Sequence, residues 1–148
     1  MKTNRVYRSI REMVENQTVF SITPDASVHQ AAVLMTTHRI GALPVIQGTE
    51  LIGIFTERDL VSRVVEPGLN PDSTPVVQVM TEQPKTISAD KSLCDALKLM
   101  HTHGFRHLPI VDGGRLMGML SFRDIPTDYQ VMWEKWTEAR QPLETAAA

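Results

Sequence analysis

The chain has 148 residues, of which 42% are hydrophobic and 22% charged, and its net charge at pH 7 is −2. This balance is ordinary for a compact folded protein, and it offers no basic surface of the kind that binds nucleic acids. No run approaches the roughly 18 apolar residues of a membrane span, and the first ten residues lack the apolar core of a signal peptide. The single cysteine, Cys94, excludes an internal disulfide. We therefore expect a cytoplasmic protein that binds neither nucleic acid nor membrane.

The first element that the sequence predicts is a helix near the N-terminus. Apolar residues recur there at helical spacing, and basic residues occupy the other faces. We place an N-terminal helical extension at 1–12, directly before the first of two similar units. The apolar positions are Val6, Ile10, Met13 and Val14.

An internal repeat is the strongest signal in the sequence. Residues 21–60 match residues 86–125 at a constant offset of 65 without a gap, and fifteen of the forty pairs are identical. Such self-similarity indicates a duplicated supersecondary unit. We place the first repeat at 13–65 and the second at 78–128. Residues 66–77 contain the stretch EPGLNPDSTP and have the composition of a linker.

Each repeat predicts the same series of elements, β-α-β-β-α. A short strand (18–22 or 85–87) precedes an amphipathic helix that begins after Ser27 or Ser92, and two strands joined by a glycine-containing turn follow. A second helix starts at Thr56 or Ser121. A unit of about 60 residues buries little core alone. We therefore predict an α/β (α+β) fold, with two β-α-β-β-α units packed sheet to sheet in pseudo-two-fold symmetry.

Residues 129–148 predict a C-terminal helix with a frayed tail. Pro126 lies too deep in the helix begun at Ser121 to be accommodated, so we expect a kink or a restart there. A stripe of apolar and aromatic residues follows at helical spacing, and it either covers its own repeat or joins two chains. We expect its tryptophans to be buried against protein and favour a dimer interface. The stripe consists of Tyr129, Met132, Trp133 and Trp136.

A hydroxyl and a carboxylate lie three residues apart where strand changes to helix in both repeats, as Thr56 and Asp59 and as Ser121 and Asp124. A helix N-terminus favours anions, and a carboxylate can accept hydrogen bonds from two adjacent hydroxyls, such as the cis-diol of a ribose. The motif therefore predicts a binding site for a nucleoside phosphate. In the plainer interpretation these residues only cap their own helices.

Each repeat resembles a cystathionine-β-synthase (CBS) domain, and the pair resembles a CBS or Bateman module. The resemblance covers roughly 13–128 and rests on LPVI…LIGIFTERD and LPIV…LMGMLSFRD in tandem. It implies a regulatory module that binds an adenosine-containing ligand, such as AMP, ADP, ATP or S-adenosylmethionine, in clefts between the two repeats.

The resemblance also implies roles for individual residues. Asp59 and Asp124 would hold ribose, and Thr56 and Ser121 would face phosphate. Basic residues before Leu-Pro would reach the phosphates, but the first repeat has Gly41 there, so two sites should differ. The basic candidates are Arg106 and His107, with Arg58 and Arg123 in the motif, and the adenine pockets would be lined by Thr18, Val19, Phe20, Gln83, Pro84 and Lys85.

Two further features of the sequence could form a site. The histidines at 101, 103 and 107 do not have the spacing of a common zinc site, and Cys94 has no partner thiol. We therefore expect no metal, and no nucleophile–base arrangement suggests an enzyme. The sequence predicts a stand-alone homodimeric module that binds an adenine nucleotide and signals to an unidentified effector protein. The alternatives are a ligand-free dimerisation or interaction protein and a redox-linked or metal-linked regulator.

Overall fold

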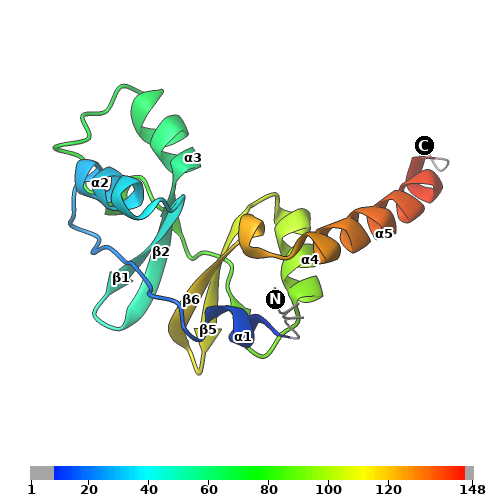
Figure 1. Cartoon of the computed structure of the whole chain (residues 1–148). Coiled ribbons are helices and arrows are strands. Elements are labelled where there is room, and N and C mark those ends of the chain that lie inside the picture. The colour runs from blue at the N-terminus through cyan, green and yellow to red at the C-terminus, as the bar shows by residue number, and fades with distance from the viewer. Residues whose placement is uncertain (1–8, 146–148) are drawn as a thin grey trace.

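The fold consists of two similar halves, each with a three-stranded sheet and helices on its outer side (Figure 1). The computed structural model describes residues 9–145, without the side chains of 136, 137 and 140–145. A short helix, α1 (Ile10–Val14), comes first. The first half contains α2 (Val28–His38), β1 (Ala42–Gln47), β2 (Glu50–Thr56), α3 (Glu57–Asp59) with its π-helical continuation Leu60–Val65, and β3 (Thr81–Glu82). The second half contains β4 (Ile87–Ser88), α4 (Leu93–His103), β5 (His107–Asp112), β6 (Arg115–Ser121) and α5 (Thr127–Thr145).

The predicted helix starts and hairpins are confirmed. Ser27 and Ser92 each form a capping box with the residue three positions later. β1 pairs antiparallel with β2, and β5 with β6, with the irregularity at the equivalent place in both hairpins. The turns use Gly48 at φ 63° and Gly113 at φ 58°, a backbone region that favours glycine. The middle strand of the first sheet, β2, contacts β6 at the edge of the second sheet, so the halves pack through their sheets.

Two predicted elements differ from the structure. The strand expected at 18–22 is reduced to a single parallel bridge between Ile22 and Val45, whereas its counterpart forms β4 alongside β5. The helix expected from Ser121 ends after one 3₁₀ turn at Phe122–Asp124, and α5 begins at Thr127. Pro126 separates the two helices because proline cannot continue a helix interior, so the expected restart is confirmed.

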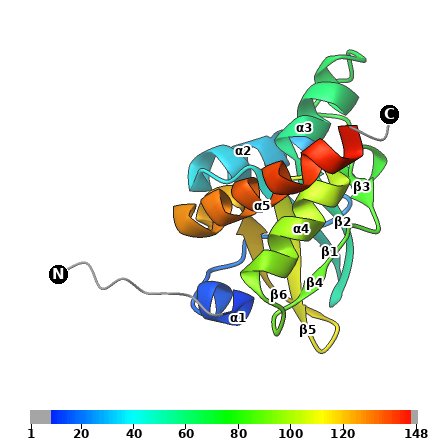
Figure 2. The same ribbon diagram turned by 90° about the vertical axis from the view of Figure 1, so that its right-hand side faces the viewer.

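The segment at the start of each repeat packs on the other repeat. Ile10 and Val14 of α1 are buried in the core of the second half, together with Leu97 and Leu108. Arg11 forms ion pairs of 2.9 Å with Asp90 and with Asp112 of that half. Figure 2 shows α1 beside the lower end of α4 and β6. The N-terminal extension is therefore part of the second half's structure.

The equivalent packing occurs in the first half, whose core is completed by residues from the start of the second repeat. Val76, Val79 and Met80 lie around the start of the second repeat but are buried in the core of the first half, around Phe55. The strand β3 extends the first sheet by pairing with β2, and Gln17 exchanges hydrogen bonds of 2.7 and 2.9 Å with Met119 of β6 at the equivalent edge. We call these two exchanged pieces, 10–17 and 76–82, the leader segments.

The C-terminal helix begins on the second half and then extends away from it (Figure 1). Trp133 is half-buried against the core of the second half and contacts His101 edge to face at 5.8 Å between ring centroids. This part of the aromatic stripe therefore covers its own repeat. Met132, on another face, is 63% exposed. The side chain of Trp136 lies outside the described residues, so the dimer interface expected there stays a prediction.

Candidate functional site

Two cavities lie between the repeats, and each is built from both of them. The first has a volume of about 740 Å³ and is lined by the Thr56–Asp59 motif together with Gln83, Pro84 and Lys85. The second has a volume of about 360 Å³ and is lined by the Ser121–Asp124 motif together with Thr18, Val19 and Phe20. Arg58 lines the first cavity, Arg123 the second, and Arg106 and His107 line both. All the residues predicted from the sequence to contact a ligand therefore line one cavity or the other, and their individual roles stay predictions.

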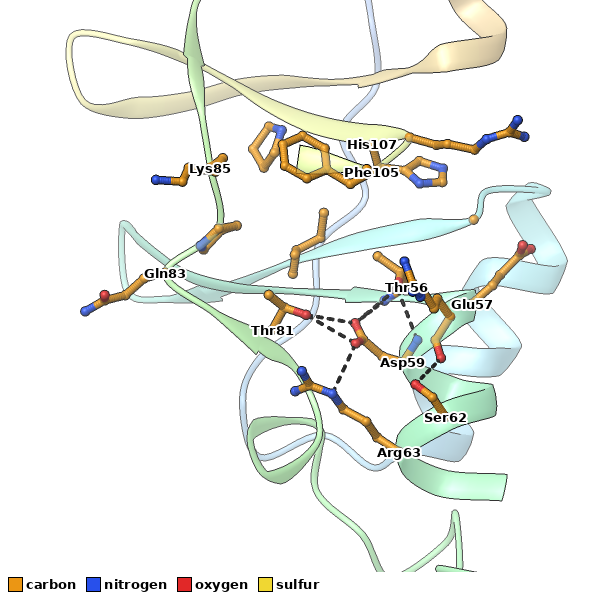
Figure 3. A pocket seen from close by; sticks show the side chains of 17 residues that line it. Thr56, Glu57, Asp59, Ser62, Arg63, Thr81, Gln83, Lys85, Phe105 and His107 are labelled. Atoms are coloured by element: carbon orange, nitrogen blue, oxygen red, sulfur yellow. Dashed lines mark hydrogen bonds and ion pairs between the residues drawn. The ribbon is translucent and has the colours of Figure 1, made fainter. Parts of the chain in front are cut away.

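Asp59, on the floor of the first cavity, is buried and held by several donors (Figure 3). One of its oxygens, Oδ2, accepts hydrogen bonds from the backbone N–H of Thr56 at 3.0 Å and from the Thr56 hydroxyl at 3.1 Å. The Thr81 hydroxyl donates to Oδ1 at 3.2 Å, and Nε of Arg63 lies 3.5 Å from the same oxygen. The side chain thus joins the α3 start to the leader strand β3.

Asp124 has the same sequence position but a different environment. It closes a capping box by accepting a hydrogen bond from the backbone N–H of Ser121 at 3.1 Å. It is exposed, and the position equivalent to Arg63 is occupied by Asp128, which cannot pair with it. A ligand hydroxyl can therefore reach Asp124 without displacing a protein donor, whereas a ligand at Asp59 must compete with Thr81.

The two cavities share one wall, formed by Gly41, Glu57, Arg106 and His107. The backbone frame is symmetric, because Glu57 donates its N–H to Gly41 O at 3.0 Å and Phe122 donates its N–H to Arg106 O at 2.8 Å. The side chains on that frame differ completely. The first repeat places a glycine and a carboxylate where the second places a guanidinium and an aromatic ring.

Contacts within the shared wall are close. A Cβ on residue 41 would lie 3.1 Å from Nε2 of His107 and 3.4 Å from Cδ of Glu57, so a larger residue there would require the His107 ring to shift slightly. The guanidinium of Arg106 lies over the ring of Phe122, 5.4 Å from its centroid. Burial lowers the pKa of His107 below its usual range, although the nearby Glu57 and Asp124 act in the opposite direction.

Aromatic rings are available in both cavities to stack on a base. Phe105 lines the first cavity and lies across from Asp59 in Figure 3, beside His107. In the second cavity Phe20 is already stacked on His38, with ring centroids 3.6 Å apart. Base–aromatic stacking tolerates any base because every base has a π-face, so stacking on these rings would not select one base over another.

Several residues that line the cavities were not predicted from the sequence. Glu57 lies between two predicted residues, but nothing in the repeat marks it because its counterpart is Phe122. Arg63 and Thr81 have no counterparts of the same type, since the equivalent positions hold Asp128 and Asn16. A repeat comparison finds shared residues, and it cannot find residues by which the two sites differ.

The metal and redox alternatives gain no support from the described residues. Among residues 9–145 no cluster of three or more His, Cys, Asp or Glu side chains is placed to hold a metal ion. Cys94 is exposed at the start of α4. No helix in the described part of the chain combines the length and the apolar character needed to cross a bilayer.

Known proteins share both the sequence and the fold. The model of the CBS domain family matches this chain twice, at residues 10–66 and 76–125. The CBS domain-containing protein YhcV of Bacillus subtilis is 35% identical over 117 residues, which are 79% of this chain and 82% of that protein. A putative signal-transduction protein with CBS domains from Burkholderia ambifaria superposes with a TM-score of 0.75 at 32% identity, over 78% of this chain and 89% of the other.

A larger assembly also contains a similar fold. A hexameric CBS-CP12 protein from bloom-forming cyanobacteria superposes with a TM-score of 0.72 at 27% identity. The match covers 79% of this chain and 69% of that one.

Proposed function

Because this chain belongs to the CBS domain family and contains two such domains in tandem, we propose that it is a regulatory module that binds an adenosine-containing ligand between its repeats. AMP, ADP and ATP are the first candidates, and S-adenosylmethionine is the next. The module acts as a homodimer and passes its ligand occupancy to an effector protein. No catalytic residues are assigned to it.

One observation supports this proposal most strongly. Each cavity combines a hydroxyl–carboxylate motif from one repeat with three residues near the start of the other repeat, 83–85 in the first cavity and 18–20 in the second. A ribose can be held by the carboxylate, a base can stack on the aromatic ring, and phosphates can approach the cations. The first cavity offers Arg58, Arg63 and Lys85, and the second offers Arg39 and Arg123.

The arrangement also supports a way in which ligand binding in a cavity could change the relative placement of the two repeats. A ligand in either cavity contacts both repeats, so it can bias their relative placement by as much as it prefers one arrangement over another. In the first cavity a diol at Asp59 competes with Thr81, which belongs to the leader strand of the other repeat. Ligand binding would therefore loosen one of the contacts between α3 and β3.

The test is calorimetric titration of AMP, ADP, ATP and S-adenosylmethionine into the wild type and into Asp59→Asn, Asp124→Asn and the double variant. Loss of a charge-assisted pair of hydrogen bonds should weaken binding at least about tenfold at the affected site, the equivalent of about 1.4 kcal/mol. Asp72→Asn is the matched control, because Asp72 pairs with His29 on the surface and lines neither cavity.

The outcomes separate the proposed function from its alternatives. Unchanged nucleotide affinity in the double variant would show that both carboxylates are only caps. No binding of any of the four ligands to the wild type would favour a ligand-free interaction protein. Molecular mass in solution, measured with and without ligand, tests the homodimer.

A further inference from the structure

We propose that the two cavities are coupled through their shared wall, so that a phosphorylated ligand bound in one weakens the binding of a phosphorylated ligand in the other. Arg106 is a cation that lines both cavities and can bind a phosphate in either. Glu57 is a carboxylate that lines both cavities and repels anions in either. The inference rests on the proposed function, because it concerns how two nucleotides would occupy the same module.

The shared wall has unbalanced charge because its two halves are not equivalent. In a fully symmetric module, positions 41 and 106 would each supply a cation to its own cavity. Here residue 41 is glycine, and Arg106 lines both cavities. Positions 57 and 122 hold a carboxylate and a phenyl ring, so Glu57 also lines both cavities without a symmetric partner.

The guanidinium of Arg106 cannot form two-point hydrogen bonds with a phosphate in each cavity at the same time. Its fork geometry pairs two N–H groups with one anion, and the stacking on Phe122 limits where it can turn. A first phosphate that engages Arg106 occupies the cation that lines both cavities, while the Glu57 carboxylate still lines the second cavity. The second phosphate then meets two negative groups, Glu57 and the first phosphate. Glu57 and Arg106 are exposed, so added salt screens this repulsion.

His107 reinforces this arrangement from the same wall. Its imidazole lies beside Gly41 and Glu57 and lines both cavities. The charged groups around it are Glu57, Asp124, Arg106 and Arg123, and burial favours the neutral ring. The wall therefore contains one permanent cation and one carboxylate, and a neutral His107 adds no second cation for a second phosphate.

The coupling predicts a difference between phosphorylated and unphosphorylated ligands. Adenosine occupies the ribose and base positions without placing charge at the shared wall, so its two binding steps should be independent. ATP should show coupling that weakens with added salt. Typical coupling between sites is about 5–150-fold in affinity.

The experiment must separate coupling from two sites that are merely different. ATP is titrated into three proteins: the wild type, a variant with the first cavity weakened (Arg58→Gln plus Lys85→Gln), and a variant with the second cavity weakened (Ser121→Ala plus Arg123→Gln). Each variant gives the affinity of the opposite cavity with its neighbour empty. The weaker step of wild type should be at least about fivefold weaker than either value.

Two further proteins assign the effect to the wall. Glu57→Gln should tighten the second ATP step of wild type, and Arg106→Gln should weaken the first step and bring the two steps back to independent values. Arg115→Gln is the matched control, because Arg115 is the first residue of β6, is exposed and lines neither cavity.

Each outcome decides the inference. ATP steps in wild type that equal the single-cavity affinities overturn the coupling while leaving the proposed function intact. ATP binding in only one cavity, seen as loss of all binding in one variant, also overturns it. Absence of ATP binding to wild type overturns the coupling, and the proposed function falls as well only if AMP, ADP and S-adenosylmethionine also fail to bind.

Discussion

Asp59 and Asp124 occupy equivalent positions in the two repeats, yet they differ in burial and in hydrogen-bond partners. Asp59 is 6% exposed and accepts hydrogen bonds from Thr56 and Thr81, with Arg63 close by. Asp124 is exposed and closes only its capping box. The comparison teaches that a duplicated motif can keep its capping box while one copy takes on a structural role. Thr56 begins a helix that continues beyond Asp59, whereas Ser121 begins a single 3₁₀ turn, and among the described residues Asp59 alone gains partners from the surrounding chain.

The largest expected effect is on stability. Asp59→Ala should lower the free energy of unfolding by about 2–3 kcal/mol, since it leaves several partly buried donors without an acceptor. Asp124→Ala should lower it by less than about 1 kcal/mol, the usual cost of losing an exposed cap. Urea denaturation of both variants measures the difference. Equal losses would mean that the extra partners of Asp59 contribute nothing.

A second test removes the partner that the other repeat supplies. Thr81→Val keeps the shape of the side chain but loses the hydroxyl that donates to Asp59, so it should cost about 1 kcal/mol. The equivalent position in the second site is Asn16, an exposed residue with no bond to Asp124 among the described contacts. Asn16→Ala should therefore leave the denaturation midpoint unchanged within error, and a comparable loss there would contradict the asymmetry.

A smaller effect is expected from the cation beside Asp59. Arg63 is half exposed, lies 3.5 Å from Asp59 and donates to the Met80 carbonyl at 2.8 Å. Arg63→Gln should cost about 0.5–1 kcal/mol, because half-exposed ion pairs contribute little. If Arg63 also competes with the ligand, the same variant should bind uncharged adenosine more tightly in the first cavity. Calorimetry and denaturation of the single variant address both points.

The smallest expected effect depends on pH and belongs to the second repeat, which has His107 where the first has Ala42. Burial lowers the pKa of His107 in the folded protein, so the unfolded chain binds more protons once the pH falls below about 6.5. This contribution to stability is complete above that pH and is lost as the pH falls toward the folded-state pKa. His107→Gln should therefore lose less stability than wild type between pH 7.5 and 5.5. Parallel denaturation slopes for the two proteins would contradict this.

The sequence predicted the parts of the fold that the two repeats share. A gapless offset places equivalent residues in equivalent positions, so a two-fold arrangement and two cavities followed from it. The capping boxes at Ser27 and Ser92 were visible because cap, spacing and apolar pattern agree. The fourteen candidate ligand residues also line the cavities; the motif residues were visible in the repeat itself, and the others were implied by the resemblance to CBS domains.

The sequence could not predict the features by which the repeats differ. The partners of Asp59 come from a different segment, and Thr81 is paired by sheet formation rather than by local pattern. The short 3₁₀ turn after Ser121 could be expected from Pro126, but the π-helical continuation after Asp59 has no such marker. The helical spacing of Ile10 and Val14 predicted an apolar face and did not identify which repeat that face would cover.

The exchange of leader segments means that neither repeat is a complete folding unit. A protein with only residues 13–65 would lack the side chains that fill its own core, because Val76, Val79 and Met80 come from later in the chain. Two copies of a single repeat could complete each other by lending their leaders, which is domain swapping between identical subunits. The tandem chain is in this sense a swapped dimer whose subunits were fused. Fusion makes the assembly independent of protein concentration, since the connecting residues hold the second unit at a high effective concentration near the first.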